Sequence, residues 1–356
     1  MIPILTYHSV RHKDVITPDA FADQMYFLSK GGYRFLSADE LYLGLLDSNL
    51  PSKSIMITFD DGYFDLYNSV FPILKKYDIK ATVFVITSRI RTGENESITS
   101  RESHIRYLLY SEKKSGFLSP DNILEMQSSG LVDFQSHSHN HVMHFGSDKI
   151  HSFYNPEKRH HWSIHYACEG KVKLGTPLYR LSPSLASPRY IPDIRLSGEI
   201  VRYTATLPNK FFYEKEWKKT EKMLDLKMDF LLSSEKFEEG KFETDEDAYK
   251  RALDDLSLSR NAIREITSKD MKYLAWPWGI YSPFGYKASA DAGFKLTFSL
   301  DRKGLLEKNE ITRFTVKKRD VEWLEKKLAS LSGGFMPKML SLIKKKKEKR
   351  LWNPQR

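Results

Sequence analysis

The chain has 356 residues, 40% of them hydrophobic and 13% aromatic, so it can bury a substantial core, and disorder is excluded as its main state. Its single cysteine, Cys168, excludes an internal disulfide and a thiolate metal cluster, so any metal must be bound by His, Asp or Glu. Residues 338–356 carry eight Lys or Arg and one Glu, and therefore +7 of the net charge of +10, which argues against a body built around a nucleic-acid groove.

The two ends of the chain suggest a location. The first residues lack the basic leader and apolar stretch of a secretory signal, and no segment approaches the roughly 18 apolar residues that span a bilayer. With the low cysteine use, this predicts a cytoplasmic protein. Apolar residues between Phe335 and Ile343, beside Lys344–Lys347, predict that the basic C-terminal tail, residues 331–356, docks peripherally on the inner, anionic membrane face. A disordered solubilising tail is the alternative.

Apolar periodicity and turn signals predict strands that alternate with helices. In chain order they are a strand at 2–7, a helix at 17–29, a strand at 33–36, a helix capped by Ser37 and running to Leu46, a strand at 54–59, a helix at 64–77, a strand at 81–87, a helix at 120–129, a strand at 131–135, a helix at 246–267, a strand at 272–276, a helix at 283–292 and strands at 295–299 and 311–316. This alternation indicates a parallel sheet or barrel. Residues 142–240 show little periodicity and contain six prolines, so we expect an insertion that contributes to substrate binding.

Two carboxylates and a glycine follow the predicted strand at 54–59. Along an ideal strand Asp60 and Asp61 would point to opposite faces, but at a strand end, beside a flexible Gly62, both can turn into one site. Two adjacent carboxylates would repel each other there unless one of them binds a cation. The pattern predicts one metal ligand and one base, although a plain Asp-Gly turn explains these residues equally well.

Histidines cluster directly after the predicted strand at 131–135. Four of the eleven, at positions 137, 139, 141 and 144, lie within eight residues. A helical turn would place His137 and His141 on one side at ligand spacing, whereas His139 and His144 are expected to form hydrogen bonds or the pocket wall. One Asp and two His leave coordination positions open, as in catalytic zinc sites. Chance clustering of surface histidines is the alternative.

These residues resemble the polysaccharide deacetylases, carbohydrate esterase family 4. The first two motifs of that family occur here in full, as Thr58-Phe59-Asp60-Asp61-Gly62 and His137-Ser138-His139-Asn140-His141. The resemblance implies that Asp60 is the general base and that Asp61, His137 and His141 bind one divalent metal, zinc first, with cobalt, nickel or manganese as alternatives. It also implies that Ser138 braces the metal loop. It extends from the first residue to about residue 316, apart from the insertion.

The third motif of the family is altered in this chain. The nearest segment is Ala275-Trp276-Pro277-Trp278-Gly279, which lacks the usual arginine. By resemblance, the backbone N–H of Trp278 is a candidate oxyanion donor, and both indoles, with Pro277, would wall the acetyl pocket. The alternative is that the tryptophans are simply core residues. Arg313 is the candidate for the group that orients Asp60.

The expected general acid comes from the start of the chain. No histidine follows His165, so the usual C-terminal histidine of the family is missing. In a circularly permuted branch, which includes poly-N-acetylglucosamine deacetylases, this histidine follows the first strand, and His8 resembles it. Protonation of a leaving amine is a step for which histidine is the usual acid. A histidine that simply packs near the barrel mouth is the alternative.

Together these features predict an α/β protein with a distorted, incomplete parallel (β/α) barrel, formed by residues 1–141 and 241–330 and interrupted by the insertion. The predicted function is metal-dependent removal of an N-acetyl group from an amino sugar in a glycan or lipid-linked precursor. A deformylase or another amidohydrolase fits the same motifs, and a substrate screen would separate them. A catalytically inactive carbohydrate-binding protein is disfavoured because the metal set is complete. Nucleic-acid binding is disfavoured because a lysine run gives only nonspecific attraction.

Overall fold

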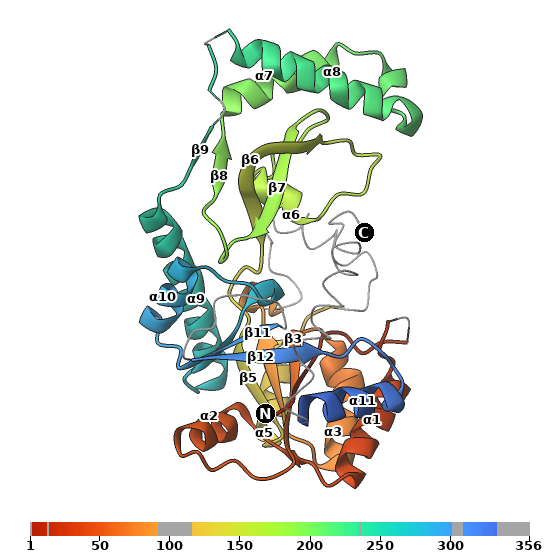
Figure 1. Cartoon of the computed structure of the whole chain (residues 1–356), viewed down its shortest axis with the longest axis vertical. Helices are drawn as coiled ribbons and strands as arrows, with labels where there is room; N and C mark the ends of the chain where they lie inside the picture. Colours follow the sequence, from red (N-terminus) through yellow and green to blue (C-terminus); the bar gives the residue numbers. More distant parts are fainter. Residues whose placement is uncertain are drawn as a thin grey trace.

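The computed structural model describes residues 2–12, 14–91, 116–234, 236–238, 240–300 and 309–332. The residues from Phe335 to Lys347, on which the predicted membrane docking rests, lie outside these ranges. No helix within them is both long and apolar enough to cross a membrane. The barrel lies at one end of the molecule, and the inserted strands and helices are stacked above it (Figure 1).

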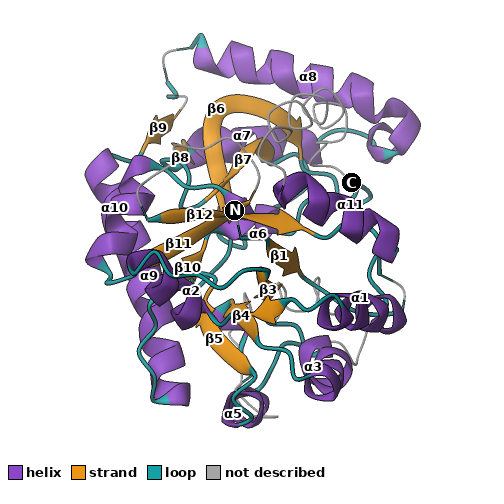
Figure 2. Cartoon of the chain, turned by 60° about the horizontal axis from the view of Figure 1, so that its bottom comes forward, coloured by secondary structure: helices purple, strands orange, loops and turns teal. Residues whose placement is uncertain are grey.

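Seven parallel strands close into a barrel in the described part of the chain. They are β1 (Ile4–Tyr7), β3 (Ser54–Asp61), β4 (Ala81–Val85), β5 (Val132–Ser136), β10 (Tyr273–Ala275), β11 (Leu296–Leu300) and β12 (Glu310–Thr315). β1 pairs with β12 on one side and with β3 on the other, which closes the ring, and β2 (Arg34–Phe35) adds to β3 outside it. Figure 2 shows helices around these strands. The predicted incomplete barrel is confirmed, because a complete (β/α)₈ barrel has eight strands.

Most of the surrounding helices begin at side-chain caps. Thr17, Ser37, Ser119 and Ser282 each accept a hydrogen bond from a backbone N–H of the first helical turn, which satisfies a donor that would otherwise lack a partner. The helices are α1 (Pro18–Lys30), α2 (Ala38–Leu46), α3 (Phe71–Tyr77), α5 (Pro120–Ser128), α9 (Asp245–Thr267), α10 (Pro283–Asp291) and α11 (Val321–Ser332). The helix expected at 64–77 instead begins with a π-helical turn, Leu66–Val70, that leads into α3.

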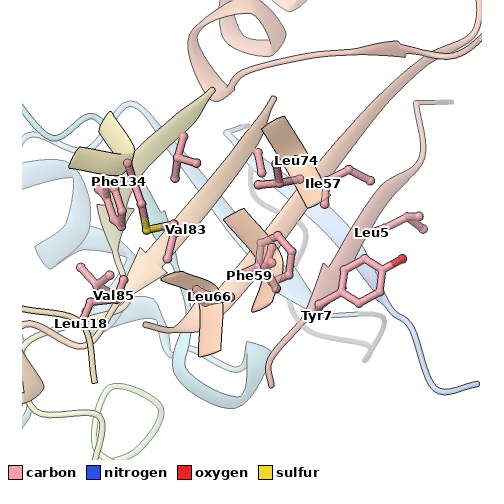
Figure 3. Close-up of a cluster of buried hydrophobic side chains, with 14 of the residues drawn as sticks. Leu5, Tyr7, Ile57, Phe59, Leu66, Leu74, Val83, Val85, Leu118 and Phe134 are labelled. Carbon is pink, nitrogen blue, oxygen red and sulfur yellow. The ribbon is translucent and has the colours of Figure 1, made fainter. Parts of the chain in front are cut away.

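The strands are apolar on both faces, which explains their near-continuous hydrophobic runs. All eight residues of β3 are buried. One face packs against the surrounding helices, and its cluster includes Leu5, Tyr7, Ile57, Phe59, Val83, Val85 and Phe134 from the strands with Leu66, Leu74 and Leu118 (Figure 3). Alternate strand residues, among them Met56, Phe84 and Phe298, form a second cluster.

The two strands β5 and β10 are joined by a seam with few backbone pairs. Their register consists of the single pair Ser136 and Leu274. Side chains supply further bonds: Gln135 Oε1 accepts the N–H groups of Lys272 and Tyr273 at 3.2 and 3.1 Å. His137 Nδ1 lies 2.8 Å from the carbonyl oxygen of Ala275, to which it can only donate. The barrel is therefore closed here largely by side chains.

Residues 142–240 contain more regular structure than their sequence indicates. β6 (Met143–Phe153) pairs with β7 (Pro177–Pro183), and β8 (Tyr190–Pro192) pairs with β9 (Gly240–Phe242). Helices α7 (Ile194–Ala205) and α8 (Glu214–Leu232) share a cluster that includes Leu196, Ile200, Trp217 and Leu224. The periodicity of α8 is obscured because Leu226 and Phe230 are 70% and 65% exposed on its outer side. The division into a barrel and an insertion at 142–240 remains our proposal.

Candidate active site

The two carboxylates lie at the carboxyl end of β3, which continues two residues beyond the predicted strand, to Asp61. Asp61 has a φ of 73° and Gly62 a φ of 81°. A Cβ at position 62 would lie 2.8 Å from Cγ1 of Val85, so this position requires glycine for both its dihedral angles and its space. The left-handed turn at Asp61 allows Asp60 and Asp61 to line one cavity instead of opposite faces of the strand.

Asp61, His137 and His141 converge in a geometry suited to a divalent metal. One ligand atom from each lies within 4.8 Å of the others. Asp61 Oδ1 is 3.6 Å from His137 Nε2 and 3.8 Å from His141 Nε2. Burial lowers the pKa of both histidines, that of His141 to about 3, so the rings are neutral and can act as ligands. Two neutral imidazoles and a carboxylate are a typical donor set of zinc, and the residues present therefore fit such an ion.

The loop that carries the two histidines differs from the helical turn expected from their spacing. Residues 137–141, which we call the metal loop, contain bends and no helix. Ser138 and His141 have φ values of 68° and 48°. The Oγ of Ser138 accepts the backbone N–H of His141 at 3.0 Å, so the predicted bracing by Ser138 has a contact that can provide it. The ring centroids of His137 and His141 are 4.7 Å apart.

Arg313 lies on β12, which is separated from β3 by β1 alone, and it holds Asp60. Its Nη1 and Nη2 donate to Asp60 Oδ1 and Oδ2 at 2.6 and 2.9 Å, and Nη1 also donates to Thr58 Oγ1 at 3.3 Å. Burial alone would raise the pKa of Asp60, but the charge of Arg313 and its hydrogen bonds to the carboxylate outweigh it and hold that pKa well below its usual range. Arg313 therefore occupies the orienting position for which the sequence made it the candidate.

His8 and Trp278 complete the cavity, which has a volume of about 390 Å³. His8 Nε2 is 3.9 Å from Asp60 Oδ2, and its side chain is 42% exposed. Trp278 has a φ of 54°, and its ring centroid lies 4.2 Å from that of His141. Groups that can accept a proton, donate one and bind a metal thus share one solvent-accessible space.

Two residues predicted to wall the pocket lie elsewhere. Trp276 is fully buried and stacks on Tyr281 with a centroid distance of 5.0 Å, and Pro277 is also buried. Neither lines the cavity, so the expectation of two indoles in the wall is wrong for Trp276. Trp276 directly follows β10 and packs in the cluster between the strands and the surrounding helices, whereas the backbone at Trp278 is left-handed and its indole lies against the ring of His141.

Several cavity residues were not anticipated from the sequence. Tyr63 and Phe117 stack with a centroid distance of 5.1 Å at one side of the cavity. Arg89 lies over the ring of Trp162 at 5.6 Å, and Trp162 belongs to the insertion. Aromatic residues carry no local motif from which the sequence could have identified them. The cavity wall is therefore shared between the barrel and the insertion.

Comparisons with known proteins agree with this geometry. Residues 47–181 match the family model of polysaccharide deacetylase. YxkH of Bacillus subtilis, whose name assigns it to the polysaccharide deacetylases, is 38% identical over 104 residues, which cover 28% of this chain and 37% of YxkH. A poly-β-1,6-N-acetyl-D-glucosamine N-deacetylase from Staphylococcus epidermidis is 29% identical over 153 residues, 38% of this chain and 47% of that protein. The chain thus spans less than half the length of these relatives.

The fold is also similar to that of solved deacetylase structures. A de-N-acetylase from Aggregatibacter actinomycetemcomitans superposes with a TM-score of 0.57 at 18% identity, covering 90% of this chain and 95% of that chain. At this identity the similarity concerns the fold alone. The matching family model and the two motifs at one site agree: over residues 47–181 the chain is similar to the polysaccharide deacetylase family.

Proposed function

We propose that this protein is a metal-dependent hydrolase that removes an N-acetyl group from an amino sugar in a glycan or a lipid-linked glycan precursor. The observation that carries the proposal is the position of Asp60, which is held by Arg313, faces His8 and adjoins the Asp61, His137 and His141 set in one cavity. The N-deacetylase names of the relatives support the same reaction.

In this proposal the residues of the chain divide the proton transfers between them. Asp60, kept ionised by Arg313, accepts a proton from the attacking water. The new C–O bond forms at the carbonyl carbon, and the backbone N–H of Trp278 donates to the carbonyl oxygen as negative charge develops on it. His8 gives a proton to the nitrogen while the C–N bond breaks. Acetate and a free amine leave.

We propose that the divalent ion held by Asp61, His137 and His141 is zinc. Such an ion would polarise the carbonyl group of the substrate and lower the pKa of bound water to about 7. Cobalt, nickel or manganese could fill the same donor set. Trp162 supports a role of the insertion in substrate binding, because it brings an aromatic surface to the cavity that bears His8 and Asp60. Aromatic faces stack on the apolar faces of sugar rings.

Acetate release by the purified full-length chain tests the proposal. We expect zinc-loaded protein to release acetate from at least one member of a panel of N-acetylated oligosaccharides, polymers and lipid-linked sugars. Chelation should abolish the release and added zinc or cobalt should restore it. Release of formate from N-formyl analogues, without acetate release, would favour a deformylase. Product release that continues unchanged after chelation would contradict a metal-dependent reaction.

The Asp60→Asn variant separates chemistry from metal binding. The amide cannot take up the proton, so turnover should fall by about 10²–10⁴-fold, the usual contribution of a general acid or base. Zinc binding, measured by calorimetry, should persist because Asp60 is not one of the converging ligand atoms. Unchanged turnover would remove Asp60 from the mechanism.

A further inference from the structure

The metal loop is held in a conformation that its own residues disfavour. Ser138 and His141 both have positive φ values, 68° and 48°. A residue with a Cβ adopts this region rarely, and it persists only where the surrounding structure imposes it. The position of His141, one of the proposed ligands, therefore depends on its contacts, of which Ser138 Oγ supplies one inside the loop and other residues supply more from outside it.

Helix α9 supplies such contacts from two residues one turn apart. Asp255, which is 8% exposed, accepts hydrogen bonds from the backbone N–H groups of His139 and Asn140 at 2.8 and 3.1 Å and from Asn140 Nδ2 at 2.8 Å. Ser259 Oγ lies 2.7 Å from Ser136 Oγ, which in turn accepts the N–H of Ser138 at 3.2 Å. The helix thus contacts the loop at its start and between its two histidine ligands.

The opposite side of the loop is held by backbone bonds from the segment after β4. The N–H groups of Thr87 and Ser88 donate to the carbonyl oxygens of Ser138 and His139 at 3.3 and 3.0 Å. The loop therefore lies between this segment and α9. On the α9 side, a single carboxylate accepts three donors, whereas an amide has one acceptor oxygen and an alkyl group has none.

We propose that Asp255 is a positioning residue for the metal site: its carboxylate fixes the segment between His137 and His141 so that both imidazoles reach one ion with Asp61. The inference rests on the proposed function, because it assumes that these three residues bind a metal. Groups that orient ligands without touching the metal typically contribute a factor of 10–100 in metal affinity. Asp255 acts here through the backbone of the loop.

The experiment measures zinc affinity of the full-length chain by calorimetry or chelator competition, with zinc alone as the probe. We expect Asp255→Ala to weaken zinc binding about 10–100-fold. Asp255→Asn keeps one acceptor oxygen and the side-chain volume, so it should lie between the alanine variant and the unaltered protein. Asp254→Ala removes the same charge from the neighbouring, exposed position of α9 and should bind zinc unchanged.

Thermal melting of the metal-free variants separates positioning from general stability. A merely structural Asp255 would lower the melting temperature while the folded protein kept its zinc affinity, and that result would overturn the proposal. An equal loss in Asp254→Ala would do the same, because it would indicate a general charge effect. If Asp255→Ala fails to fold, the comparison between Asp255→Asn and Asp254→Ala decides. If the unaltered chain itself binds no zinc, the proposed metal site fails first and this inference falls with it.

Discussion

The pairing of Arg313 with Asp60 makes a prediction about pH. Arg313 lowers the pKa of Asp60, and Asp60 must be ionised to accept a proton. Lysine at position 313 keeps a positive charge but loses the two-pronged contact. For Arg313→Lys we therefore expect the acid limb of the kcat/KM profile to move to higher pH, by less than the roughly 1–3 units that a whole opposite charge contributes. Arg319→Lys, at an exposed arginine that bonds the carbonyls of Asp14 and Val15, is the matched control. An acid limb that stays at the same pH would contradict the role of Arg313 in keeping Asp60 ionised.

His8 is expected to control the other limb of the profile. A general acid must be protonated, so activity that depends on His8 is lost as pH rises. In His8→Ala we expect turnover to fall about 10²–10⁴-fold, with selective loss of the basic limb. His12, an exposed histidine of the same segment, provides the control His12→Ala, which should leave the profile unchanged. Full activity of His8→Ala would remove the permuted-barrel assignment of the acid.

The sequence predicted the proposed base and the proposed metal ligands of the cavity because they fall at strand ends and in two compact motifs. Asp60 and Asp61 end β3, and His137 and His141 lie in the loop that follows β5, so parallel topology alone brings them to one edge. Asp255 offered a weaker signal. It is a polar residue on the stripe of α9 that also buries Ala252, Leu256 and Ser259, and such a pattern indicates a buried partner without naming it.

At the level of elements, the helix pair α7 and α8 is predicted to be a separate stability unit. Trp217 is fully buried in the cluster of this pair. Trp217→Ala should cost about 3–5 kcal/mol of the stability of the pair, as large-to-small core substitutions do. Zinc affinity should be retained, because the contacts to the metal loop come from α9 and the segment after β4.

Chemical denaturation monitored together with zinc calorimetry checks this expectation. Leu226→Ala, at a side chain of α8 that is 70% exposed, is the control and should change little. A parallel fall of stability and zinc affinity in Trp217→Ala would mean that the helix pair and the barrel unfold together.

Elements of the barrel were predictable because buried parallel strands are continuous apolar runs bounded by turn signals. The inserted elements were harder. β6 spans eleven residues but has irregular register with β7, which removes the alternation that identifies a strand. In α8, apolar residues on the outer side blur the stripe that identifies a helix. Tertiary context, not local pattern, decides such segments.

At the scale of the whole molecule, the basic tail predicts membrane attraction. Each Lys or Arg near an anionic bilayer contributes about 1 kcal/mol, and residues 338–356 carry eight of them. In flotation with anionic vesicles, we expect the full chain to rise with the lipid and a truncation ending at Ser332 to remain below. Neutral vesicles are the control. Equal flotation of both proteins, or of neither, would leave no role for the tail.

The side-chain bonds between β5 and β10 give the proposed ligand His137 a second, structural role. The ring of His137 offers Nε2 to the proposed ion while its Nδ1 donates across the seam to Ala275. A bound ion would therefore strengthen the connection between β5 and β10, because the imidazole of His137 would contact both the ion and Ala275. Amide hydrogen exchange at Lys272 and Tyr273, whose N–H groups are bonded to Gln135 across this seam, should slow when zinc binds. Loss of the ion would then loosen the junction between β5 and β10.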